Sequence, residues 1–101
     1  MGMGNLAKMA QQMQADMARV EQELRDMQVE GSAGGGVVKA VVTGKQDLVS
    51  LVIDPSVVDP DDVEMLQDLI VAAVGDALAT ARRTAEEKMA RVTSGLRLPG
   101  F

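Results

Sequence analysis

The sequence contains no cysteine, histidine, tryptophan or tyrosine, and its single aromatic residue is Phe101. The absence of cysteine excludes disulfide bonds and thiolate nucleophiles, and it gives no sign of an oxidising compartment. The absence of histidine removes the commonest general base near neutral pH and the commonest metal ligand. The remaining nucleophiles are serines and threonines without a histidine partner for an ordinary catalytic triad. These absences argue against an enzyme and against a cofactor.

Long hydrophobic runs are also absent. The N-terminal stretch MGMGNLAKMAQQ lacks the apolar segment that a secretory signal needs. Gly2 is not part of a myristoylation motif, because Leu6 stands where that motif requires serine or threonine. No apolar run approaches the length that crosses a bilayer. We therefore expect a cytoplasmic protein that has no membrane partner.

The length and the charge distribution indicate one domain with an uneven surface. The 101 residues suffice for a single core, so we expect one domain over 1–101. The net charge is −5, but residues 54–76 contain seven acidic residues and no basic one. Residues 77–101 contain five basic and two acidic residues. The acidic average therefore conceals a basic C-terminal quarter.

A heptad pattern of apolar residues predicts a helix over about residues 5–27, with Asn5 suited to its N-cap. Two rows with seven-residue spacing make up the pattern, which is typical of a helix that packs lengthwise on another helix. The rows consist of Leu6, Met13, Val20 and Met27, and of Ala10, Met17 and Leu24. The methionines are interpreted as packing residues, since methionine suits irregular contacts.

Segments rich in β-branched residues predict three strands, over about residues 29–33, 37–43 and 48–53. Glycines separate the first two strands, and Gly44-Lys45-Gln46-Asp47 separates the last two, so the strands should form an antiparallel meander. The glycine-rich turn is not a phosphate-binding loop, because it opens a strand and lacks the lysine that such a loop requires.

A second helix is predicted over about residues 60–93, with Asp59 as its cap, Pro60 in its first turn and Gly75 as a point where it can bend. Its first half is apolar on nearly all sides, so it must be buried against its own sheet and against a second surface. We predict that the second surface is another copy of the chain. The predicted dimer-interface residues are Val63, Leu66, Ile70 and Val74.

Element lengths predict the shape of the molecule. A helix over residues 60–93 is roughly 50 Å long, whereas a seven-residue strand spans roughly 23 Å. The helices must therefore extend beyond the sheet, where their free ends can pack as an antiparallel two-helix arm. We predict an α+β fold of order α-β-β-β-α, in two layers, whose homodimer has protruding arms like tweezers. We assign no packing partner to the apolar tail over residues 95–101.

The acidic residues near the start of the second helix do not form an EF-hand, because the required alternation and the glycine and glutamate at fixed positions are missing. Helix capping and the helix dipole account for these residues. We therefore expect no bound metal and no small-molecule substrate.

The basic residues towards the C-terminus allow two interpretations. They suit the negative end of the helix dipole and pairs such as Glu87 with Arg91, in which case they form an ordinary solvated face. In the arm arrangement Lys8 lies near Lys88 and Arg91, and two such arms can straddle a duplex and bind its phosphates. No aromatic side chain is available for base stacking, which argues against a single-strand binder. The candidate DNA contacts are Lys8, Arg82, Arg83, Lys88 and Arg91.

Four stretches carry a family resemblance: GNLAKMAQQMQADM at 4–17, VEGSAGGGVVKAVVTG at 29–44, IDPSVVDPDDVEMLQDLIVAAVGDA at 53–77 and EKMARVTSGLRLPGF at 87–101. In these stretches the chain resembles the YbaB/EbfC family of bacterial nucleoid-associated proteins. The stretches span almost the whole chain and keep the family order. The resemblance implies a helix, three antiparallel strands and a long helical region, assembled as a tweezer-like homodimer.

Members of this family look like DNA-binding proteins that coat or compact the chromosome, with weak or modest sequence preference and sometimes an influence on transcription. The resemblance implies double-stranded DNA as the partner, the nucleoid as the location, and the five candidate residues on the arm helices as the contacts. An alternative function is an adaptor for DNA replication or recombination proteins, which would use the two-sided apolar helix and the acidic segment over residues 54–76.

Overall fold

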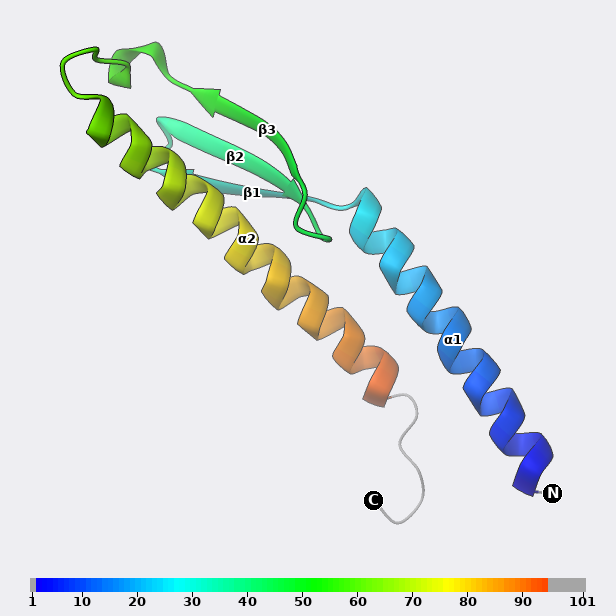
Figure 1. The fold of residues 1–101 in the computed structure, drawn as a ribbon. Coiled ribbons are helices and arrows are strands. Elements are labelled where there is room, and N and C mark those ends of the chain that lie inside the picture. Colours follow the sequence, from blue (N-terminus) through cyan, green and yellow to red (C-terminus); the bar gives the residue numbers. More distant parts are fainter. Residues whose placement is uncertain (1, 95–101) are drawn as a thin grey trace.

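The computed structural model describes residues 2–94, which form two long helices connected through a three-stranded sheet (Figure 1). The molecule is elongated, with dimensions of 72 × 24 × 16 Å. The elements are α1 (Gly2–Asp26), β1 (Gln28–Ala33), β2 (Val38–Thr43), β3 (Leu48–Ile53), η1 (Pro55–Val57) and α2 (Val63–Ser94). This order confirms the predicted α+β class and the α-β-β-β-α arrangement. Neither helix, over the residues described, combines the length and apolar character that a membrane span needs.

The sheet is the predicted antiparallel meander, with β2 between β1 and β3. Ala40 in β2 pairs with Gly31 of β1 on one side and with Leu51 of β3 on the other. The β2–β3 pairing shifts by one residue after Val41, which is a β-bulge. The β1–β2 turn contains three glycines, at 34–36, all with positive φ, a conformation that side chains disfavour. Each strand lies within one residue of its predicted bounds.

Helix α2 packs on one face of the sheet, over β1 and β2, and leaves β3 largely uncovered. The inward side chains of β2 are fully buried: Val38, Ala40 and Val42. They meet a row of small residues spaced by four on α2, which therefore share one face of the helix: Ala73, Ala77 and Ala81. These small side chains allow the sheet and the helix to approach closely, so the core is thin.

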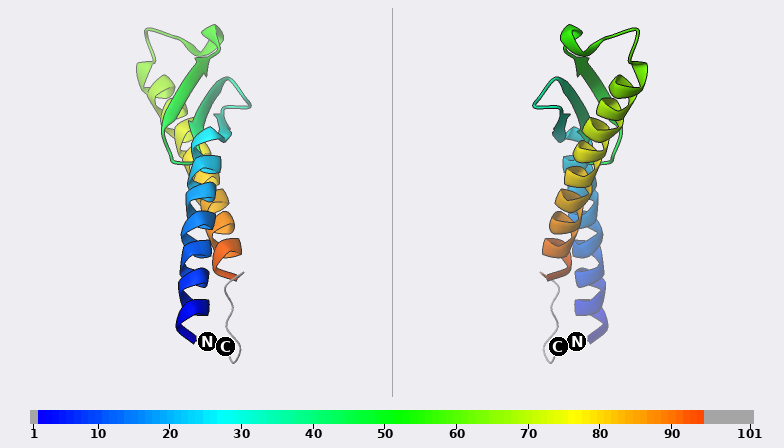
Figure 2. Two further views of the ribbon diagram at one scale, coloured as in Figure 1. Left: turned by 90° about the vertical axis from the view of Figure 1, so that its right-hand side faces the viewer. Right: turned by 90° about the vertical axis from the view of Figure 1, so that its left-hand side faces the viewer.

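Beyond the sheet, α1 and the last turns of α2 pack together (Figures 1 and 2), and we call residues 2–26 and 82–94 the arm. Its buried centre consists of Val20, Leu24 and Val92, with Met13, Met27, Ala85 and Met89 packed around them. This contact confirms the prediction that the heptad pattern meets the second half of the second helix. Leu6 lies fourteen residues before Val20, roughly 21 Å along α1, and it is 60% exposed.

The arm is fixed to the sheet at Gly44, in the β2–β3 turn. The Gly44 N–H donates a hydrogen bond of 2.8 Å to the carbonyl oxygen of Leu24, near the end of α1. A Cβ at position 44 would lie 2.8 Å from that same oxygen and 2.9 Å from Leu24 Cδ2. The predicted turn residue therefore also sets how α1 leaves the sheet.

The structure corrects one prediction about the helices and answers one question that the sequence left open. Helix α1 begins at Gly2, so Asn5 lies inside the helix and does not cap it. Helix α2 runs without interruption through Gly75, which lies on its exposed side, so the helix neither breaks nor splits there. The apolar tail over residues 95–101 lies outside the described residues.

The start of α2 also differs from the prediction, because the acidic residues form a turn before the helix. The Asp59 carboxylate accepts a hydrogen bond of 2.9 Å from the N–H of Asp61. The Asp62 carboxylate accepts one of 3.2 Å from the N–H of Met65, in the first turn of α2. Asp62 rather than Asp59 therefore caps the helix, which begins at Val63, three residues later than predicted.

The short helix η1 was not predicted from the sequence. Asp54 stands at its N-cap, and the Asp54 carboxylate accepts a hydrogen bond of 2.9 Å from the N–H of Ser56. Hydrogen bonds from the backbone and the side chain of Ser56 lower the pKa of the Asp54 carboxyl group. This acidic residue therefore has a local structural role at the end of β3.

Candidate nucleic-acid interface

Charge is segregated along the length of the molecule. The arm carries seven basic and six acidic residues. The body, residues 27–81, carries two basic and nine acidic residues. The arm is therefore close to neutral, and the body holds nearly all of the excess negative charge. Because like charges repel, a polyanion such as DNA can approach the arm more readily than the body.

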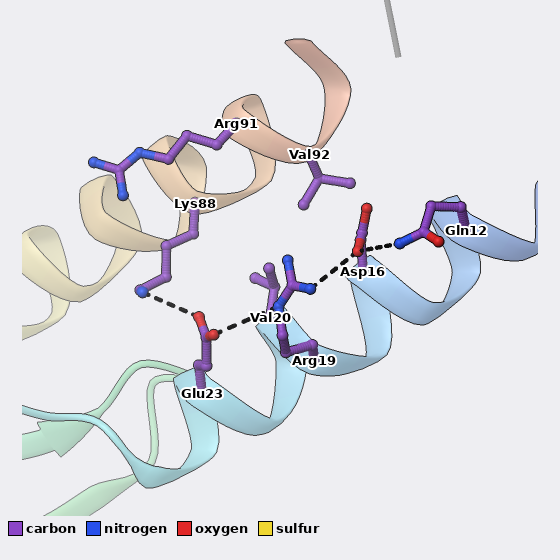
Figure 3. A pocket seen from close by; sticks show the side chains of 8 residues that line it. All are labelled: Gln12, Asp16, Arg19, Val20, Glu23, Lys88, Arg91 and Val92. Atoms are coloured by element: carbon purple, nitrogen blue, oxygen red, sulfur yellow. Dashed lines mark hydrogen bonds and ion pairs between the residues drawn. The ribbon is translucent and has the colours of Figure 1, made fainter. Parts of the chain in front are cut away.

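One side of the arm is hollowed between α1 and α2 (Figure 3), and the hollow has a volume of about 290 Å³. We call it the arm groove. It is lined by Gln12, Asp16, Arg19, Val20, Glu23, Lys88, Arg91 and Val92. The two valines belong to the buried centre of the arm, and charged side chains from both helices surround them.

Carboxylates of α1 contact the cations of the arm groove at short range. Lys88 Nζ lies 3.2 Å from Glu23 Oε2. Arg19 Nη1 lies 3.0 Å from Asp16 Oδ1, and Arg19 Nε lies 3.7 Å from Glu23 Oε1. Glu23 therefore bridges one cation from each helix. The side chain of Arg19 is 62% exposed and that of Lys88 is 25% exposed, so water reaches these ion pairs.

Arg91 lines the same groove but makes no ion pair with any residue in the described part of the chain. The pair of Glu87 with Arg91 that the sequence suggested is not formed between these two residues. The side chain of Arg91 is exposed. Among the three cations that line the groove, it is therefore the one that no described carboxylate holds.

The predicted DNA contacts on α2 do not share one face of the helix. Lys88 and Arg91 line the groove, whereas Arg82 lies nine residues before Arg91. At about 100° per residue, nine residues place Arg82 on the opposite side of the helix. Arg83 is exposed, and its guanidinium donates a hydrogen bond of 3.4 Å to the Thr80 hydroxyl. Of the four predicted contacts on α2, the structure therefore brings together only Lys88 and Arg91.

Lys8 does not lie beside Lys88, so the predicted neighbourhood of these two residues is wrong. The contact of Lys88 on α1 is Glu23, fifteen residues or roughly 22 Å from Lys8 along the helix. The first half of α2 packs on the sheet, and only the last turns of α2 contact α1. Lys8 lies on the same side of α1 as Arg19, since eleven residues make about three turns. It therefore extends the basic side of the arm beyond the groove.

Arg19 was not among the basic residues that the sequence singled out. The sequence nevertheless contains a signal for Arg19. Asp16, Arg19 and Glu23 have the i,i+3 and i,i+4 spacings of an ion-pair network on one helix face. That network flanks the heptad pattern, so it had to lie near the second helix. The sequence did not indicate which cations of the second helix it would meet.

The other side of the arm carries a hollow of about 250 Å³ between α1, the β2–β3 turn and α2. Glu21 lies there and pairs with Arg25 at 3.6 Å and with Lys45 at 3.8 Å. Lys45 is the one basic residue that lines this hollow, compared with three in the arm groove. The arm groove is therefore the more cationic of the two sides.

No three His, Cys, Asp or Glu side chains gather as a metal site among the residues that the structure describes. The acidic residues at the start of α2 instead serve as turn and helix caps. The chemistry of the arm is that of charge pairing and hydrogen bonding.

The body carries a second candidate surface, which is apolar. Every residue of β3 except Ile53 is exposed, because α2 covers β1 and β2 instead. Of the predicted dimer-interface residues, Val63 is 52% exposed, whereas three are half-buried against the core of their own subunit: Leu66, Ile70 and Val74. Leu51 pairs with the buried Ala40 and Val52 with the exposed Lys39, so the apolar side chains of β3 lie on both faces of this edge strand. The exposed apolar side chains of the body, which we call the apolar surface, are Leu48, Val49, Leu51, Val52, Val58, Val63, Met65 and Val71.

Comparison with known proteins shows close relatives along the whole chain. A nucleoid-associated protein of Moorella thermoacetica is 55% identical over 104 residues that cover all of both chains. One from Exiguobacterium sp. is 50% identical and covers 99% of this chain and 98% of the relative. Another, from Acetivibrio thermocellus, is 53% identical and covers 96% of this chain and 87% of the relative. The names of all three relatives associate them with the nucleoid.

The fold is shared with the crystal structure of an uncharacterised protein from Helicobacter pylori. The TM-score is 0.71 at 24% identity, and the match covers 95% of this chain and 97% of the other. At this identity the likeness concerns the fold alone. The sequence itself matches the YbaB/EbfC DNA-binding family over residues 1–96. The chain therefore belongs to the YbaB/EbfC DNA-binding family, whose relatives named above are nucleoid-associated proteins.

Proposed function

We propose that the chain binds double-stranded DNA as a homodimer, with little sequence specificity, through basic residues of the arm. In this role it contributes to chromosome organisation in the nucleoid, from which an influence on gene regulation follows. The proposed DNA contacts are Lys8, Arg82, Arg83, Lys88 and Arg91.

The segregation of charge carries this proposal. Seven of the ten basic residues lie on the arm, whereas nine of the fifteen acidic residues lie on the body. Binding to phosphates depends on the local cations and on the counterions that they release from DNA, so an acidic net charge does not prevent it. Phosphate contacts carry no sequence information. An arm that offers lysine and arginine but no aromatic side chain is therefore suited to binding without reading the bases.

The apolar surface supports the homodimer. Its side chains lie on β3, after η1 and on the first half of α2, where the single subunit offers no cover. The outer edge of β3 also has no strand partner among the described residues. An uncovered strand edge and exposed apolar side chains of this kind tend to associate. A second copy about a two-fold axis would cover both surfaces and leave two arms projecting from one body.

A gel-shift experiment with several unrelated duplexes tests the proposed contacts. We expect the Arg82→Glu/Arg83→Glu double substitution to weaken binding by about tenfold or more, because it replaces two attractive charges with repulsive ones. The substitution Lys39→Glu reverses a charge on the body and should change binding much less. A double variant that remains dimeric and retards DNA as well as the wild type would contradict the proposed role of Arg82 and Arg83.

A further inference from the structure

In the arm groove, the carboxylate of Glu23 forms ion pairs with two of the cations that a DNA phosphate would bind. Glu23 lies 3.2 Å from Lys88 and 3.7 Å from Arg19, one cation from each helix (Figure 3). A phosphodiester oxygen is also anionic and accepts hydrogen bonds from the same donors. We infer that Glu23 is an intramolecular competitor of DNA phosphate, which holds Lys88 and Arg19 in the free protein and releases them to the duplex. This inference rests on the proposed function and deepens it.

Because the ion pairs are exposed to water, replacing Glu23 by a phosphate costs little free energy. The side chains of Glu23 and Arg19 are 45% and 62% exposed, and that of Lys88 is 25% exposed. Ion pairs in contact with water contribute little to stability. A deeply buried pair would resist separation, because each charge left alone would be without its only partner. Here the released Glu23 carboxylate returns to water.

The arrangement of the groove also provides a first contact for the phosphate. Arg91 is exposed and makes no ion pair with a described residue. It lies three residues from Lys88, on the same rim of the groove. A phosphate that reaches Arg91 is therefore placed within one helical turn of the Lys88–Glu23 pair.

A second carboxylate extends the competition. Asp16 holds the Arg19 guanidinium at 3.0 Å and is itself held by Gln12, whose side-chain amide donates to it at 3.1 Å. The groove thus contains three cations and two carboxylates. Since phosphates are the same in every sequence, this competition changes the strength of binding and not the choice of site.

Glu21 provides a matched control for Glu23. The two residues are of the same type, lie two positions apart on α1 and each contact two cations. Glu21 contacts Arg25 and Lys45 on the other side of the arm. The substitutions Glu23→Gln and Glu21→Gln therefore change the net charge equally but at different sides.

The experiment measures the dissociation constant of the full-length protein for one duplex at fixed salt, by fluorescence anisotropy. We expect Glu23→Gln to bind about two- to thirtyfold more tightly than the wild type, the range expected when two exposed ion pairs of about 0.2–1 kcal/mol each no longer have to be broken. Glu21→Gln should change binding much less. Thermal unfolding checks that both variants are folded. If Glu23→Gln binds no more tightly than the wild type, or if Glu21→Gln binds as tightly as Glu23→Gln, the inference is overturned.

A double-mutant cycle tests the route through Lys88. In a Lys88→Gln background, Glu23→Gln should increase the affinity less than it does in the wild type, because one of the two competed cations has been removed. An equal increase in both backgrounds would overturn the inference. A wild-type protein that does not bind duplex DNA would refute the proposed function itself, whereas a binding wild type with an unresponsive Glu23 refutes the competition alone.

Discussion

At the residue scale, the close packing of β1 on α2 depends on the lack of a side chain at one position. Gly31 lies in the middle of β1, and a Cβ there would overlap the backbone of Ala73 and Ala77. Backbone atoms of a buried helix cannot rotate away as a flexible side chain can. Gly75 lies in the same region of α2, but a Cβ there would meet nothing within 4 Å. The two glycines therefore respond to substitution in opposite directions.

We predict that Gly31→Ala destabilises the protein by about 1–3 kcal/mol or more, since the added methyl group forces the sheet and the helix apart. Gly75→Ala should instead stabilise it by about 0.5–1 kcal/mol, because alanine favours the helical conformation. Urea-induced unfolding at one protein concentration measures both changes. A Gly31→Ala variant that is as stable as the wild type would contradict the described packing.

At the element scale, local signals predicted the elements well and contacts between the helices less well. Alternating valines and the glycine turns defined the strands to within one residue. The start of α2 was misplaced because Asp59 and Asp62 are both good caps, and only the surrounding turn decides between them. The pairing of Lys88 with Glu23 could not be predicted, because it depends on how many residues of α2 the sheet occupies.

We predict that Gly44→Ala loosens α1 from the sheet, because a Cβ would collide with the Leu24 carbonyl oxygen that the Gly44 N–H binds. Amide hydrogen exchange should become faster in the last two turns of α1, with a smaller effect in β1 and β2. Gly4→Ala is the control, since position 4 lies in α1 itself and a Cβ there would meet no atom within 4 Å. Unchanged exchange in α1 of Gly44→Ala would argue against this joint.

At the scale of the whole molecule, the fold separates two tasks. The body exposes apolar side chains on β3 and on the first half of α2, and it carries most of the acidic residues. The arm carries most of the basic residues and extends away from the sheet (Figure 2). In the proposed homodimer, the acidic bodies meet through apolar contacts, and the arms reach the duplex.

We predict that Leu51→Lys/Val63→Lys converts the homodimer to a monomer, because it places two charges in the proposed interface. Leu6→Lys is a matched control, since Leu6 is equally apolar and 60% exposed but lies at the far end of the arm. Sedimentation equilibrium should give twice the 10.7 kDa mass of one chain for the wild type and for Leu6→Lys. A wild-type monomer at micromolar concentration, or a double variant that still dimerises, would contradict the proposed interface.

The most direct test of the central claim is the salt dependence of DNA affinity for the wild type, Arg91→Gln and Lys39→Gln. Both substitutions remove one cation that has no ion pair in the described structure, one from the arm groove and one from the body. We predict that log affinity falls linearly with log salt, alike for unrelated duplexes, and that Arg91→Gln reduces the slope by about 0.9 for each phosphate that the arm no longer neutralises. Lys39→Gln should leave the slope unchanged. Equal slopes for all three proteins, or binding that is insensitive to salt, would contradict binding of DNA phosphates by the arm.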